Sequence, residues 1–253
     1  CRVLEFLGVI VYMLVSKDHP LRCTPKAMFD FHGDFAKEVT KTAFPVVITE
    51  IMFSVLASVV FAIYGILGSA ELAVVQVAEV VANMVQVIFF GLGNATAVSL
   101  GGALGQNDPD RAAEYAKISF KVAVFLCGIA CVVLFLIAKP VSTLYPDFEA
   151  STIVILIRTL LVWGIITIPK MMNYVIICGI LRAGGDTIYS LKIEIIGNLF
   201  VQVPLALIAV LVFRWPLYFC ILFVSISDIV KCFLSIQRML SKRWINIYRQ
   251  DYM

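Results

Sequence analysis

Six long stretches of apolar residues follow one another along this chain, and each is long enough to cross a lipid bilayer. They lie at about residues 42–66, 71–104, 112–138, 150–182, 187–213 and 216–240. A helix of about 20 apolar residues spans the hydrocarbon core, and it satisfies its own backbone hydrogen bonds there. The sequence therefore predicts an all-α polytopic membrane protein.

The composition agrees with this prediction and excludes several other classes of protein. The chain is 61% hydrophobic and 15% charged, whereas soluble domains have about 45–50% apolar and about 25% charged residues. The net charge of +3 comes without a concentrated basic face, so no nucleic-acid partner is expected. Cys127 and Cys131 share a helix face, but no second pair of ligands follows them, so a zinc site is not expected. The sequence contains no nucleophile–base pair and no phosphate-binding loop, so neither an enzyme nor a cofactor is predicted.

The predicted organisation has four parts. Residues 1–16 are expected to be the end of a truncated transmembrane helix, because the chain begins inside an apolar run and without a methionine. A polar loop is expected at 17–41, the six-helix transmembrane lobe at 42–241 and a tail at 242–253. Basic residues concentrate in this loop, after the second span, beside the turn at 183–186 and in the tail, which predicts that these segments are cytoplasmic.

Prolines and glycines predict where the spans bend and turn. Pro45, Pro169 and Pro204 lie inside spans, and proline removes a backbone donor and crowds the preceding turn, so these three are candidate hinges. The segment Gly184-Gly185-Asp186 is expected to form a tight reversal whose aspartate caps the following helix.

Polar side chains recur at helical spacing inside five of the six spans. The five stripes are Glu50, Ser54 and Ser58; Gln76, Glu79, Asn83, Gln86 and Asn94; Thr167, Lys170 and Asn173; Ser190, Glu194, Asn198 and Gln202; Ser225, Asp228, Cys232 and Ser235. A bundle can keep all of them away from lipid only by turning them inward. Ionisable residues at this depth mark cavities or transport pathways.

The candidate binding residues follow from these stripes. They are Glu50, Glu79, Asn83, Lys170, Asn173, Glu194, Asn198 and Asp228. Two other interpretations stay open at this point. The amides can serve as hydrogen bonds between helices, and Lys170 can form a buried ion pair with one of the carboxylates.

Several motifs resemble the second lobe of the multidrug and toxic compound extrusion (MATE) family, in the family's order and over roughly residues 40–243. They are PVVITE, ILGSAELAVVQVAEVV, GLGNATAVSLGGALGQNDPDRAAEYAK, GILRAGGDT and VPLALI. The resemblance implies a twelve-helix transporter of two six-helix lobes. This chain would then hold the end of helix six and the whole second lobe. Its expected partner would be the N-terminal lobe of the same protein, which this chain lacks.

The resemblance also implies a function and roles for some residues. The family exports organic cations and other toxic compounds, driven by sodium or proton flow. Glu50 matches the seventh-helix glutamate that is tied to cation coupling, and so becomes a candidate sodium site. Asp228 and Lys231 match a D-x-x-K pattern in the last helix, and Glu194 stands where many members have an acidic residue. Met171 stands where one branch has an aspartate, which departs from that branch's ion site.

The expected function is therefore that of a drug antiporter in the bacterial inner membrane. Two alternatives are a lipid-linked saccharide flippase of the same superfamily and a membrane scaffold that transports nothing. A flippase would need a more cationic cavity, and a scaffold has no need for polar stripes in its core.

Overall fold

The structure, a computed structural model, describes Gly8, Tyr12, residues 33–146 and residues 148–245. The chain divides into two compact units, Cys1–Phe44 and Pro45–Met253. The predicted helix end at 1–16 and most of the predicted loop at 17–41 lie outside the described residues.

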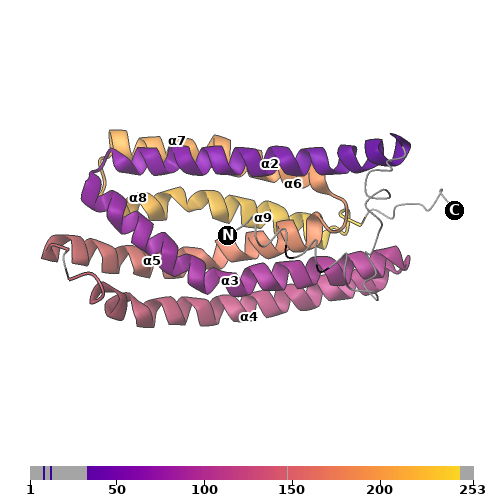
Figure 1. Ribbon diagram of the computed structural model, residues 1–253, viewed down its shortest axis with the longest axis horizontal. Helices are drawn as coiled ribbons and strands as arrows, with labels where there is room; N and C mark the ends of the chain where they lie inside the picture. Colours follow the sequence, from indigo (N-terminus) through magenta and orange to yellow (C-terminus); the bar gives the residue numbers. More distant parts are fainter. Residues whose placement is uncertain (1–7, 9–11, 13–32, 147, 246–253) are drawn as a thin grey trace. The chain divides into compact units, whose positions relative to one another are not determined.

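The described residues form helices and contain no strand, which confirms the all-α prediction. The first three spans belong to α2 (Gly33–Gly65), α3 (Ser69–Gly105) and α4 (Pro109–Ser142). The fourth consists of α5 (Ala150–Tyr174) and the π-helical η2 (Val175–Leu181). The remaining segments are α6 (Thr187–Glu194), η3 (Ile195–Gln202), α7 (Val203–Leu207), η4 (Ile208–Val212), α8 (Leu217–Val224) and α9 (Ile226–Leu240). Long helices α3, α4 and α5 lie side by side (Figure 1).

Six of these helical stretches are long and apolar enough to cross a membrane. Their outer faces carry large apolar side chains in the open, among them Val98 at 77%, Leu136 at 71% and Phe125 at 69% exposure. Monomeric soluble proteins rarely expose continuous apolar surface of this kind, whereas lipid covers it without cost. The chain is an integral membrane protein.

Helix α2 begins earlier than the sequence suggested. The last part of the predicted 17–41 loop is helical from Gly33 onward. The segment 34–44 contains neither glycine nor proline, so no residue in it stops a helix on the polar side of the membrane boundary. Hydropathy detects where a helix enters lipid, and it misses a polar extension of the same helix.

The irregular turns of the spans do not all fall at prolines. The helices α2 and α5 continue through Pro45 and Pro169. The π-helical segment η2 begins only at Val175, whereas η3 ends directly before the turn that holds Pro204. The sixth span breaks at Ser225, where no proline stands. The hinge roles of the three prolines stay predictions.

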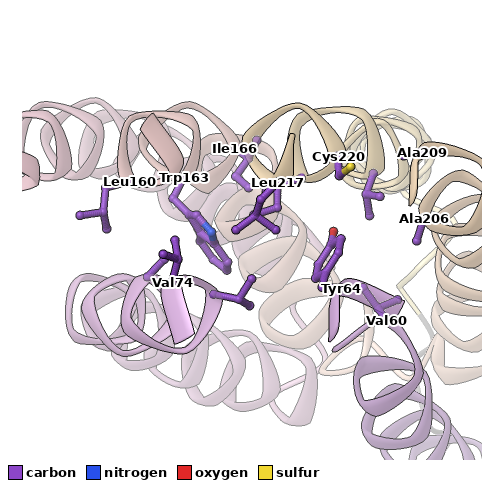
Figure 2. Packing of buried hydrophobic residues seen from close by; sticks show 14 of the residues in the cluster. Val60, Tyr64, Val74, Leu160, Trp163, Ile166, Ala206, Ala209, Leu217 and Cys220 are labelled. Carbon is purple, nitrogen blue, oxygen red and sulfur yellow. The ribbon is translucent and has the colours of Figure 1, made fainter. Parts of the chain in front are cut away.

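Two apolar clusters hold the second unit together, and they lie at different levels along the helices. The first joins the end of α2 to α3, α5, α7 and α8 through residues such as Val60, Val74, Leu160 and Leu217 (Figure 2). The second joins α3, α4, α5, η2 and α9 through Phe89, Ala123, Ile176, Met239 and others. The polar stripes fall between or beside the members of the two clusters on each helix, so the polar region forms at an intermediate level.

The turn after η2 has a different chemistry from the one that its sequence suggested. Gly185 has a φ of +82°, which favours glycine. The side chain of Asp186 does not cap α6. Its Oδ2 instead accepts a hydrogen bond of 2.6 Å from Nε of Arg238, and the two side chains form an ion pair between this turn and α9. A partner 52 positions away outcompetes the local backbone donors because it carries a full charge.

Gly184 lies against the buried Trp244, which follows α9. A methyl group on Gly184 would overlap the Trp244 ring and also its carbonyl oxygen, a backbone atom that cannot swing away. We expect Gly184→Ala to destabilise the protein by about 1–3 kcal/mol, the usual range for overpacking. Thermal unfolding in detergent measures the effect.

The matched control is Gly128→Ala, because the Cβ of that variant meets no atom within 4 Å. This control should keep or raise the stability, since alanine favours the helix. Equal unfolding temperatures for the two variants would contradict the packing argument at Gly184.

Candidate functional site

A cavity of about 440 Å³ lies inside the second unit, and all eight candidate residues line it. Glu50 comes from α2, Glu79 and Asn83 from α3, Lys170 and Asn173 from α5, Glu194 from α6, Asn198 from η3 and Asp228 from α9. Their convergence follows from the helical spacing of the stripes and from the exclusion of charge by lipid. Their roles in binding stay predictions. The volume is within the range of pockets that hold drug-sized molecules.

Glu50 forms an ion pair across the cavity. Its Oε1 accepts a hydrogen bond of 2.7 Å from Nη1 of Arg182, the residue that follows η2. The Glu50 side chain is 60% exposed, whereas that of Arg182 is 18% exposed. The carboxylate can therefore be reached from the cavity while its partner is largely enclosed. A cation that binds Glu50 must compete with this guanidinium.

A second ion pair belongs to a hydrogen-bond network between α9 and η3. Nζ of Lys231 lies 2.9 Å from Oδ1 of Asp228 and donates a 2.9 Å hydrogen bond to Oδ1 of Asn198. Nδ2 of Asn198 donates to Oε2 of Glu194 at 2.6 Å. A Cβ on Gly197 would overlap the aliphatic stem of Lys231, so glycine at this position leaves the room that the lysine occupies.

Asn173 ties α5 to the same part of α9. Its Nδ2 donates a 2.8 Å hydrogen bond to the Asp228 carbonyl oxygen, and its Oδ1 accepts one of 3.4 Å from Oγ of Ser235. Asn173 and Asn198 are therefore bonded to other helices or to network residues. The alternative interpretation of the amides as contacts between helices describes these two well.

Lys170 does not form the buried ion pair that the sequence allowed. Among the described residues, no carboxylate is ion-paired with it. Its Nζ lies instead 4.5 Å from the centre of the Trp163 ring, in a cation–π contact. The two residues are seven positions apart on α5 and so share a helix face. Asp228, one of the carboxylates that line the same cavity, is already paired with Lys231.

Glu79 and Asn83 are exposed to the cavity from α3. Within the described part of the chain, neither side chain forms a hydrogen bond or an ion pair. Two members of the same predicted stripe, Gln76 and Asn94, do not line the cavity. A helix of 37 residues is longer than one cavity, so a stripe along it cannot all reach the same site.

Several residues that line the cavity were not predicted from the sequence. Arg182, one of the basic residues beside the turn at 183–186, was used only to predict the cytoplasmic side, and the aromatic residues Tyr64, Trp163 and Tyr174 were not selected. Spacing provides a usable signal for two of them, because Trp163 and Tyr174 stand seven positions before and four after Lys170 and so lie on its helix face. Aromatic residues in an apolar span give no other sign of a role.

The cavity does not resemble a site for a tightly bound metal. No group of three or more His, Cys, Asp or Glu side chains within the described ranges gathers to hold one. A transported sodium ion needs weaker binding, and Glu50 as its site stays a prediction.

Comparison with known proteins identifies the family. The sequence model of the MatE family matches residues 45–208, well over half of the chain. A search of curated proteins finds no significant match.

Solved transporter structures share the fold at low sequence identity. A MOP superfamily transporter from Pyrococcus furiosus, whose binding pocket is described as having reverse polarity, matches with a TM-score of 0.79 and 18% identity over 95% of this chain and 54% of its own. A MATE transporter in the straight conformation matches with a TM-score of 0.81 and 17% identity over 95% and 54%.

A multidrug resistance MATE transporter in the outward-facing conformation matches with a TM-score of 0.79 and 18% identity over 95% and 54%. The chain spans about half the length of these transporters. With the six membrane-spanning helices and the matched family model, the chain belongs to the MATE family of membrane transporters and has the fold of half of one.

Proposed function

We propose that the full-length protein containing this chain is a secondary active antiporter, which exports organic cations in exchange for sodium ions or protons. We place it in the bacterial inner membrane, with the segments rich in basic residues on the cytoplasmic side. This chain supplies the C-terminal lobe, and an N-terminal lobe closes the transport pathway. The observation that carries the proposal is the cavity, into which four carboxylates from four different helices project.

The ion pair between Glu50 and Arg182 supports a coupling mechanism. A sodium ion, a proton or a cationic substrate at Glu50 neutralises the carboxylate and weakens its hold on Arg182. The link between α2 and the end of η2 then loosens. A ligand shifts a conformational equilibrium only by its different affinities for the two states. The binding of a cation at Glu50 differs in this way, because only the state with a broken ion pair leaves the carboxylate fully available.

The two alternative functions receive less support. A flippase for lipid-linked saccharides has to bind a pyrophosphate, yet the cavity has three basic residues against four acidic ones, and Arg182 and Lys231 are already ion-paired. A scaffold would gain nothing from a cavity lined by charges, since each charge raises the cost of membrane insertion.

The proposal is tested with the full-length protein in proteoliposomes. A fluorescent organic cation such as ethidium is placed on the side from which export starts, and a sodium gradient or a pH gradient is imposed separately. We expect one of the gradients to drive movement of the dye, and an ionophore that collapses this gradient to stop it. Liposomes without protein serve as the control. Dye movement that ignores both gradients would refute antiport.

A further inference from the structure

Arg158 is a charged residue of the fourth span that does not line the cavity. It lies on α5 four positions after Val154 and seven before Ile165, so it shares the helix face of these two residues. Val154 is 45% exposed and Ile165 is 51% exposed. The cavity residue Trp163 stands five positions from Arg158, about 140° further around the helix. Arg158 therefore belongs to the side of α5 that faces away from the cavity and carries apolar surface that lipid covers.

The guanidinium of Arg158 is held in place by a tyrosine and not by a carboxylate. Its Nη1 donates a hydrogen bond of 3.1 Å to Oη of Tyr218 on α8, and its Cζ lies 5.3 Å from the centre of that ring. Within the described ranges, Arg158 forms no ion pair and no other hydrogen bond. Tyr218 orients the guanidinium without neutralising it, and a charge beside lipid is costly until it finds a counter-charge. The site is therefore suited to an anion that the described chain does not supply.

The site lies at the level where lipid head groups are expected. Helices α5 and α8 begin at the same end of the bundle (Figure 1), and Arg158 is about 12 Å from the start of α5. Aromatic rings gather at the start of α8, with ring centres 4.7 Å apart in the pair Phe213–Trp215 and 4.7 Å apart in the pair Tyr218–Phe219. Tyrosine and tryptophan concentrate at the interface between membrane and water. An arginine can bury its apolar stem while its charge reaches that interface, so Arg158 can reach lipid phosphates.

The described charges near this end of the bundle favour an anion. Arg214 is exposed and stands four positions before Tyr218, in a segment at 213–219 that contains no acidic residue. Glu149 directly precedes α5, but nine positions separate it from Arg158, which is about two and a half helical turns. A negatively charged group at Arg158 is therefore attracted by its surroundings.

We propose that Arg158 and Tyr218 bind the phosphate of an anionic phospholipid whose acyl chains lie against the exposed apolar faces of α5 and α8. The planar guanidinium can donate two parallel hydrogen bonds to phosphate oxygens. The Tyr218 hydroxyl accepts from Arg158 and keeps its own proton to donate to the same phosphate. Phe219 and Leu222 of α8, which are 49% and 42% exposed, provide surface for the acyl chains. The bound lipid joins α5 to α8 on the side away from the cavity, so this site is separate from the transport pathway.

A lipid is favoured over a carboxylate from the missing N-terminal lobe. Under the proposed function this lobe closes the transport pathway, and the pathway side of α5 is the side of Trp163 and Lys170. Arg158 faces away from that side. A zwitterionic phosphatidylcholine fits less well than an anionic lipid, because its own ammonium group lies beside the phosphate and is repelled by Arg158 and Arg214.

A second arginine–tyrosine pair provides a matched control. Nε of Arg111 donates a hydrogen bond of 3.0 Å to Oη of Tyr115, and its Cζ lies 5.7 Å from the ring centre. This pair lies at the polar beginning of α4, where Asp108, Asp110 and Glu114 stand within one helical turn of Arg111 in the sequence. Carboxylates are therefore close at hand, and we expect no lipid site there.

The test titrates the purified full-length protein in detergent with dioleoyl phosphatidylglycerol, which is anionic, and separately with dioleoyl phosphatidylcholine. Native mass spectrometry measures the fraction of protein that carries bound lipid. We expect the wild-type protein to bind phosphatidylglycerol more tightly. Arg158→Gln should weaken this binding by about tenfold and abolish the preference. Tyr218→Phe should weaken it by a smaller factor, and Arg111→Gln should behave like the wild type.

Arg158→Lys keeps the charge and loses the planar fork, so it should retain part of the preference. With Tyr218→Phe, it also carries the test if Arg158→Gln cannot be purified. The proposal is overturned if the Arg158 and Tyr218 variants bind phosphatidylglycerol like the wild type, if Arg111→Gln weakens binding as much as Arg158→Gln, or if the wild-type protein binds both lipids equally. Thermal unfolding identifies a counter-charge in the protein instead: Arg158→Gln would then lower the unfolding temperature equally with and without phosphatidylglycerol, which also overturns the proposal.

Discussion

Glu50→Gln in the full-length transporter is expected to reduce gradient-driven export of an organic cation by at least about tenfold, toward the level of liposomes without protein. The substitution keeps the size and hydrogen-bonding ability of the side chain and removes its charge. Glu50 is the cavity carboxylate that is both exposed and shared with a basic residue from another helix. Export and membrane expression are measured in parallel, because a loss of activity counts only if the protein is still inserted.

The control variant breaks the same ion pair by replacing its basic partner, Arg182. Arg182→Gln leaves Glu50 charged and frees it from a competitor 2.7 Å away. If Glu50 binds a cation, Arg182→Gln should bind a cationic dye as tightly as the wild type or more tightly. If Glu50 only holds Arg182 in place, the two variants should lose binding alike. Glu114→Gln, on the exposed face of α4 outside the cavity, is expected to change nothing.

The second large effect is expected at the ion pair between Lys231 and Asp228. The two side chains are only 9% and 14% exposed. Lys231→Met leaves the Asp228 carboxylate without its cation and also breaks the bond to Asn198. Removal of one partner from a buried pair costs about 3–5 kcal/mol, because the remaining charge stays uncompensated. Loss of monodisperse protein on heating in detergent, followed by gel filtration, measures the destabilisation.

The double variant Lys231→Met with Asp228→Asn distinguishes this cause from lost packing. It removes both charges, so we expect it to be more stable than Lys231→Met alone. Lys192→Met makes the same chemical change at an exposed site and should be nearly neutral. Destabilisations that simply add up in the double variant would show that the pair does not act as a unit.

The polar stripes made the candidate binding residues of the cavity wall predictable. They did not show which of these residues form hydrogen bonds or ion pairs with one another. Glu50, Lys170 and Asp228 were selected because lipid excludes charge and the helical period shows which residues share a face. Partner choice depends on how separate helices approach one another. Glu50 is 132 positions from Arg182 in the chain, and no local pattern connects them.

The features that the sequence did not predict have separate physical causes. Asp186 stands where an aspartate usually caps a helix, yet it binds Arg238 because α9 brings a charged donor within 2.6 Å. The beginning of α2 was placed too late because hydropathy reports only the apolar part of a helix that extends into polar surroundings. For Lys170 the sequence left a buried ion pair with a carboxylate open, and the contact that Lys170 makes with Trp163 depends on side-chain conformations that spacing alone does not determine.

By itself, the sequence determined the number of membrane spans, the all-α class, the family motifs and the eight candidate residues that line the cavity. Each of these follows from short-range rules, namely hydrophobic length, helical period and the cost of charge in lipid. The tertiary structure alone decided that Glu50 pairs with Arg182 and that Lys170 and Glu79 have no charged partner among the described residues. These outcomes depend on how closely side chains from different helices approach one another, whereas Lys231 and Asp228 stand three positions apart on the same helix.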